Sequence, residues 1–305
     1  MFILIFEQLV KMFFIMALAF ICYRIGLVNQ DGNKTVSNLL LLVVNPILII
    51  TAYQTDYDPE LVRGLFLSFI AAAVCHLIGI VLSTVLVRPG SGDDYSIDRY
   101  NAMYSNCGFI GIPLIGSVLG SSGIFFLTAF MAMFNLFSWT HGVILMEKKC
   151  SLKSLKEGLL SPTFLATIVA ILLFFIRIRI PEVLLDSMNY IADMNTPLAM
   201  MVAGFSVAQA NIGRMCRNLR LYYVAAIKLI ILPLCCIPIL LLLPLSSEVA
   251  MTTLIAAACP SATAGIMMAI RYNQNYTYAS EAFSLSTLLS VLTLPLVVLI
   301  AEQVL

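Results

Sequence analysis

Long apolar runs, repeated along almost the whole chain, constrain this sequence more than any other feature. A helix that spans the hydrocarbon core of a bilayer needs about 20 predominantly apolar residues. Short polar connections separate runs of roughly this length, which lie at residues 3–26, 37–53, 61–87, 101–119, 122–146, 158–176, 183–208, 219–243, 249–270 and 279–303. The sequence therefore predicts an all-α polytopic membrane protein with ten transmembrane helices.

The composition excludes several other classes of protein. Hydrophobic residues make up 61% of the chain and charged residues 11%, whereas soluble domains carry about 45–50% apolar and about 25% charged residues. A soluble enzyme, a disordered chain and a nucleic-acid-binding protein are therefore excluded. The chain contains no phosphate-binding loop of the form G-x-x-x-x-G-K-[ST], so it brings no ATPase of its own. We expect the lipid bilayer as its surroundings, with no cofactor and no bound metal.

The basic residues indicate how the chain lies in the membrane, because cytoplasmic loops carry an excess of Lys and Arg. With the N-terminus outside, only Arg63, Arg177 and Arg179 fall on the outer side. The loops predicted to face the cytoplasm hold twelve basic residues: Arg24, Lys34, Arg88, Arg99, Lys148, Lys149, Lys153, Lys156, Arg214, Arg217, Arg220 and Arg271. We therefore expect a plasma-membrane protein with both termini outside the cytoplasm.

The longest of these loops divides the chain into two halves of five helices, residues 1–146 and 158–305, with a cytoplasmic linker at 147–157. Because five is odd, the second half must be inverted relative to the first, which is a common architecture in secondary transporters. The halves share features at equivalent positions. Pro46 in the second helix matches Pro197 in the seventh, and Pro113 in the fourth matches Pro260 in the ninth. These matches predict an inverted repeat.

The fourth and ninth helices contain residues that disfavour a continuous helix. Gly108, Gly111 and Pro113 lie close together in the fourth, and Pro260 lies in a run of small polar residues in the ninth. Non-helical backbone is tolerated at membrane depth only where protein or a water-filled cavity satisfies it. Two broken helices that cross there would point half-helix N-termini, each with about half a positive charge, at one spot. We therefore predict a carboxylate site with the substrate-binding residues Ser105, Asn106, Cys107, Gly108, Ser261 and Thr263, and with breaks at Gly111, Pro113 and Pro260.

These residues resemble the auxin efflux carrier family, which includes plant PIN-type carriers and bacterial organic-anion carriers. The spacing of Asn106, Gly111 and Ile112-Pro113-Leu114, followed by Gly120, is similar to the family motif in the fourth helix. The resemblance extends over nearly the whole chain. It implies a fold related to the bile-acid–sodium symporters, in which helices 1, 2, 6 and 7 form a scaffold and helices 3–5 and 8–10 a transport unit. It also implies a homodimer, an elevator-type movement, and a substrate contact at Asn106.

The resemblance fails at one place in the third helix. Plant carriers have an acid–base pair there, whereas Ala73 and Leu77 occupy the matching positions in this chain, with His76 beside them. A coupling role based on that pair therefore does not transfer. H+ and Na+ remain the candidate coupling ions.

Three ionisable residues within the predicted helices are candidates for coupling, since such groups are costly in a bilayer and often functional. His76 is either a proton acceptor or a structural, hydrogen-bonded histidine. Lys228 either attracts anions, or pairs with an acid or extends to the membrane surface. Asp193 either binds a proton or cation, or caps a break at Thr196-Pro197.

The sequence as a whole predicts a secondary active transporter or uniporter of small organic anions, namely carboxylates, that works by elevator-type alternating access. One alternative is a membrane sensor that binds a carboxylate without moving it. A second alternative is an intramembrane enzyme, for example one with Cys107 beside His76. Neither histidine belongs to an H-E-x-x-H metal motif, which disfavours the enzyme. We therefore expect a transporter rather than an enzyme.

Overall fold

The computed structural model describes residues 2–88, 94–147 and 152–305. All regular structure in these ranges is helical, with no β-strand. The first part of the chain forms α1 (Phe2–Arg24), α2 (Gln30–Leu39), η1 (Leu40–Val44), α3 (Asn45–Ala52), α4 (Pro59–Leu86), α5 (Tyr95–Met103), η2 (Cys107–Gly111), α6 (Ile112–Phe137), η3 (Ser138–Gly142) and α7 (Val143–Glu147). Residues 148–151 of the predicted linker, including Lys148 and Lys149, lie outside the described ranges.

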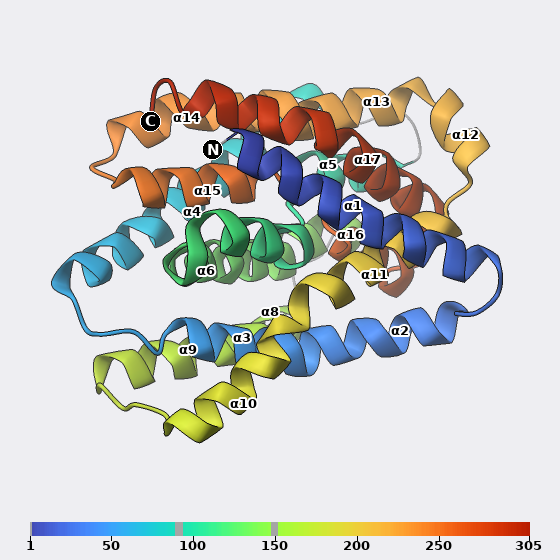
Figure 1. The fold of residues 1–305 in the computed structure, drawn as a ribbon. Coiled ribbons are helices and arrows are strands. Elements are labelled where there is room, and N and C mark those ends of the chain that lie inside the picture. Colours follow the sequence, from blue (N-terminus) through green and yellow to red (C-terminus); the bar gives the residue numbers. More distant parts are fainter. Residues whose placement is uncertain (1, 89–93, 148–151) are drawn as a thin grey trace.

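The second part of the chain is helical in the same way (Figure 1). It forms α8 (Leu152–Leu159), α9 (Pro162–Phe175), α10 (Glu182–Asp193), α11 (Asn195–Gln209), α12 (Ile212–Arg217), α13 (Leu219–Ala226), η4 (Ile227–Ile231), α14 (Leu232–Leu242), α15 (Ser247–Ala258), α16 (Ala264–Arg271) and α17 (Tyr276–Ala301).

Seven helical stretches among the described residues are long and apolar enough to cross a bilayer: Ile3–Arg24, Gln30–Ala52, Pro59–Leu86, Cys107–Glu147, Glu182–Gln209, Leu219–Leu242 and Tyr276–Ala301. Pro162–Phe175 and Ser247–Ala258 are shorter apolar helices. Large apolar side chains such as Phe14 and Leu242 are 75% and 83% exposed, as expected for surfaces that face lipid rather than water. The chain is therefore an all-helical, multi-pass membrane protein.

Prolines within these stretches are accommodated by wider helical turns. The π-helical segments η1, η2 and η4 end two residues before Pro46, Pro113 and Pro233, respectively. In each case the residue before the proline donates its N–H to the carbonyl five residues back. A proline has no N–H and its ring clashes with the carbonyl four residues back, so the wider turn lets the helix continue past it.

This accommodation corrects the predicted position of the break in the fourth helix. Gly111 and Pro113 are in helical backbone, and Pro113 lies in the first turn of α6. The chain instead leaves the helical conformation over residues 104–106, between α5 and η2. In the ninth helix, Pro260 does lie in the non-helical segment between α15 and α16.

No break occurs at Thr196-Pro197, where the sequence predicts one. α10 and α11 are separated by Met194 alone, which itself has near-helical dihedral angles. Pro197 lies in the first turn of α11, where an N–H has no intrahelical partner in any case. Asp193 therefore does not cap a break, and its side chain is exposed.

A change of direction does occur inside the long stretch Cys107–Glu147. Gly120 has a φ of +66° and a ψ of −155°, which is not helical. L-residues with a side chain rarely adopt this conformation, and glycine adopts it without steric cost. Gly120 thus separates the part of α6 that follows η2 from the part that leads to η3.

Candidate functional site

The two broken segments are bound to each other through their backbones. The Asn106 N–H donates to the Pro260 carbonyl at 2.7 Å, and the Ala262 N–H donates to the Tyr104 carbonyl at 2.9 Å. Ser105 and Ser261 face each other in this short antiparallel bridge, and both are buried. Each break thereby supplies hydrogen-bond partners for polar backbone groups of the other, as non-helical backbone inside a membrane requires.

Two serines also cap the helices that end at the breaks. Ser105 Oγ donates to the Ala257 carbonyl at the C-terminus of α15, at 3.1 Å. Ser261 Oγ donates to the Asn101 carbonyl near the C-terminus of α5, at 2.8 Å. Each serine thus satisfies an unpaired carbonyl at the end of the other broken helix. The relationship is reciprocal.

Lys228 lies at the same place and extends from η4, on a third stretch of helix. Its side chain is fully buried, and Nζ donates to Ser105 Oγ at 2.7 Å and to the Ala257 carbonyl at 2.6 Å. No carboxylate of the described residues forms an ion pair with it. The sequence suggested that Lys228 pairs with an acid or extends to the membrane surface. The structure shows neither arrangement.

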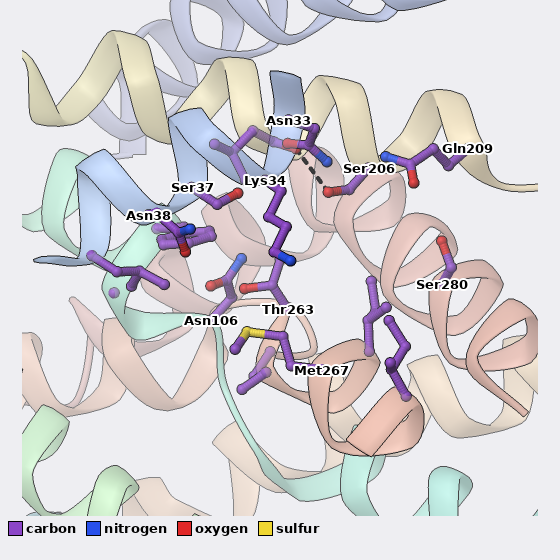
Figure 2. A pocket seen from close by; sticks show the side chains of 18 of the residues that line it. Asn33, Lys34, Ser37, Asn38, Asn106, Ser206, Gln209, Thr263, Met267 and Ser280 are labelled. Atoms are coloured by element: carbon purple, nitrogen blue, oxygen red, sulfur yellow. Dashed lines mark hydrogen bonds between the residues drawn. The ribbon is translucent and has the colours of Figure 1, made fainter. Parts of the chain in front are cut away.

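A cavity of about 490 Å³ lies beside the paired breaks. Two groups of segments form its walls. Helices α2 and α11 form one side, and the breaks with η2, α16 and α17 form the other (Figure 2). Four of the predicted substrate-binding residues line it, namely Ser105, Asn106, Gly108 and Thr263. Cys107 and Ser261 are buried beside the breaks and do not line the cavity.

Asn106 lines this cavity and carries an unused hydrogen-bond donor. The residue is 4% exposed, and its amide nitrogen Nδ2 has no hydrogen-bond partner. A buried donor without a partner costs about 1–3 kcal/mol, so the position favours a ligand with an acceptor. Gly108 and Thr263 line the cavity at the starts of η2 and α16. Helix N-termini carry a partial positive charge and unpaired N–H groups, which favours an anion.

The wall formed by α2 and α11 contains polar residues that are not among the candidate site residues predicted from the sequence. These residues are Gln30, Asn33, Lys34, Ser37, Asn38, Ser206 and Gln209. Figure 2 shows the Lys34 side chain reaching from α2 toward Asn106 and Thr263. The available signal was the spacing of Gln30, Lys34 and Asn38, which recurs every four residues and places them on one face of a helix.

His76 and Asp193 do not line the cavity. His76 is buried in α4, with Nδ1 at 2.7 Å from the Ala72 carbonyl and its ring stacked on Phe137 at 5.3 Å. A second ring, that of Phe130, lies 4.7 Å away. His76 thus has the hydrogen bond expected of a structural histidine. Its role as a proton acceptor stays a prediction. Asp193 is exposed at the end of α10.

Comparison with known proteins identifies the family. Residues 4–151 and 149–298 match the family described as membrane transport protein. The chain belongs to this family, the auxin efflux carriers. An uncharacterized transporter of Methanothermobacter thermautotrophicus is 24% identical over 304 residues, which cover 95% of this chain and 96% of that protein.

Two further relatives of this membrane transport protein match over part of their length. The uncharacterized transporter YfdV of Escherichia coli (strain K12) is 27% identical over 158 residues, 52% of this chain and 49% of that protein. The match therefore spans about half the length of this relative. The uncharacterized transporter MJ1031 of Methanocaldococcus jannaschii is 22% identical over 192 residues, 60% of this chain and 62% of that protein.

Proposed function

We propose that this membrane transport protein moves small carboxylates across the plasma membrane, as a secondary active carrier or a uniporter. The observation that carries this proposal is the unpartnered Nδ2 of Asn106, buried at the junction of two broken helices. A carboxylate oxygen at this position would accept a hydrogen bond from Asn106. The helix N-termini at Gly108 and Thr263 would stabilise its charge. The small organic anion is then held without a metal or cofactor.

The proposed architecture is ten transmembrane helices in a 5+5 inverted repeat, with the fold of the bile-acid–sodium symporters. The reciprocal caps of Ser105 and Ser261 support it, because each serine lies in one break and bonds to the end of the other broken helix. Asn45 and Asn195 provide a further contact between the two halves. They begin α3 and α11, and Asn195 Nδ2 donates to Asn45 Oδ1 at 2.6 Å. We further propose that two copies pair through the scaffold helices.

We also propose an elevator-type movement, which the two walls of the cavity support. α2 and α11 belong to the proposed scaffold, whereas the breaks, α16 and α17 belong to the proposed transport unit. A substrate bound between them passes across the bilayer when the transport unit slides along the scaffold. The cavity reaches Lys34 near the start of α2 and Gln209 at the end of α11. Because Lys34 belongs to the side predicted to be cytoplasmic, we interpret this state as inward-facing.

Flux measurements distinguish a sensor from a transporter, and the contacts of His76 bear on the enzyme alternative. A sensor would bind the carboxylate at the same site without moving it. The example of an enzyme considered from the sequence places Cys107 beside His76, whereas the His76 ring packs against Phe130 and Phe137. The geometry therefore favours binding over catalysis.

The test is uptake of radiolabelled small carboxylates by proteoliposomes that contain the purified protein. We expect uptake by the wild type, and a loss of about tenfold or more in binding and flux for Asn106→Ala, because a hydrogen bond to a charged group is worth about 1.5–3 kcal/mol. Asn189→Ala, at an exposed position in α10, is the matched control and should leave both unchanged. Binding without uptake would indicate the sensor. Equal uptake by Asn106→Ala and wild type would reject the assigned site.

A further inference from the structure

Lys228 is a fully buried charged residue within the long apolar stretch Leu219–Leu242. Its side chain is 0% exposed, and both of its hydrogen bonds go to uncharged oxygens, Ser105 Oγ and the Ala257 carbonyl. Charged side chains at membrane depth are costly and usually pair with an opposite charge. Among the described residues no carboxylate forms an ion pair with Lys228. Another source of negative potential must therefore stabilise the ammonium.

That source is the end of a broken helix. Ala257 is the second-last residue of α15 (Ser247–Ala258), so its carbonyl is one of the last four, which lack intrahelical partners. These carbonyls carry the negative end of the helix dipole. In transporters with discontinuous helices, unwound carbonyls and half-helix C-termini are where coupling cations bind. At this position the cation is covalently part of the chain.

We propose that the Lys228 ammonium is a resident cation, which fills the place that a free Na+ would otherwise occupy at the paired breaks. The carrier then needs no Na+ for substrate binding or for flux. Lys228 acts as a positioning residue: its ammonium holds Ser105 against the C-terminus of α15. Ser105 precedes Asn106, whose backbone N–H is bonded to Pro260. The statement about flux rests on the proposed function, whereas the statement about cation occupancy does not.

The first experiment measures the purified wild type in Na+, K+ and choline salts at equal ionic strength. We expect the same thermal unfolding midpoint and the same carboxylate flux in all three. A saturable rise of either quantity with Na+, absent with choline, would overturn the proposal. This outcome requires no variant and therefore does not depend on whether a substituted chain folds.

The second experiment empties the position with Lys228→Ala. We expect a lower unfolding midpoint and at least about tenfold less flux, since two hydrogen bonds from a charged donor are lost. Ethylammonium or Na+ should raise the midpoint of this variant and restore part of its flux, while choline, which is too large and has no N–H, should do neither. The matched control is Lys11→Ala, which removes an exposed lysine of α1 and should respond to no cation.

The outcomes separate this inference from the proposed function. A Lys228→Ala protein with the midpoint and flux of the wild type, or one that no small cation stabilises, would overturn the resident cation. A wild type that moves no carboxylate, together with a Lys228→Ala variant that ethylammonium stabilises, would overturn the proposed transport and support the resident cation.

Discussion

The backbone N–H of Asn106 donates to the carbonyl of Pro260 at 2.7 Å, which joins the two broken helices at the residue that offers its side chain to the cavity. The backbone of Asn106 is therefore fixed by one set of bonds while its Nδ2 remains without a partner. Substitutions of the side chain should change ligand binding and leave the pairing of the breaks in place. This separation allows the site to be tested without disturbing the fold.

Asn106→Asp is the most direct substitution, because it keeps the shape of the side chain and replaces the donor by a carboxylate. We expect carboxylate binding to fall by more than in Asn106→Ala, since like charges in a partly desolvated site repel each other. The unfolding midpoint should change little, because the backbone bond to Pro260 is retained. Calorimetric titration with small carboxylates measures the first effect and thermal unfolding the second. Binding at wild-type strength would show that the anion does not contact this side chain.

Pro113→Ala tests where the fourth helix is interrupted. Pro113 lies in continuous helical backbone behind the π-helical turn η2, and the break lies at residues 104–106. Because the paired backbones do not involve Pro113, we expect carboxylate binding within about threefold of the wild type, less than 1 kcal/mol. Asn106→Ala is the contrasting variant in the same titration. A loss as large as that of Asn106→Ala would mean that Pro113 itself shapes the site.

The sequence predicted the helices and the regions of the breaks better than it predicted their details. Apolar runs of membrane length indicate helices because nothing else satisfies the backbone in lipid. Glycine and proline indicated that two segments were unusual, but the position of the break depends on how the chain around Pro113 adjusts. The π-helical turn η2 lets the helix continue through Pro113. Pro260, in contrast, lies in non-helical backbone.

Contacts between segments that are distant in the chain could not be predicted from the sequence. Lys228 is 123 residues from Ser105, its hydrogen-bond acceptor. No local pattern distinguishes this lysine from one that extends to the membrane surface. The polar residues of α2 were not predicted for a different reason. Asn33 and its neighbours have the composition of a turn, and the apolar run predicts a helix that starts only at residue 37. In the structure, α2 begins at Gln30.

Lys34→Gln tests whether the wall formed by α2 contributes to binding an anion. Lys34 lines the cavity and is an exposed residue. An exposed charge contributes roughly 1 kcal/mol or less, so we expect carboxylate affinity to fall about threefold to fivefold. The difference from the wild type should shrink at high ionic strength, because salt screens exposed charges. Lys11→Gln in α1 is the control for removing a positive charge. Equal affinity of Lys34→Gln and wild type at low salt would exclude a direct contribution.

Gly204→Ala tests the packing of α1 against α11, two helices of the proposed scaffold. A Cβ at Gly204 would collide with the Met16 carbonyl oxygen and lie 2.8 Å from Ala19 Cβ, so the backbones themselves would have to separate. Overpacking of this kind costs about 1–3 kcal/mol, and we expect a lower thermal unfolding midpoint. Gly213→Ala in α12 is the matched control, since the nearest atom to its Cβ would be Asn211 Oδ1 at 3.7 Å. Replacing a helical glycine without a clash stabilises by about 0.4–1 kcal/mol, so the two variants should shift the midpoint in opposite directions. A midpoint of Gly204→Ala equal to or above that of the wild type would show that α1 and α11 are not in close contact at Gly204.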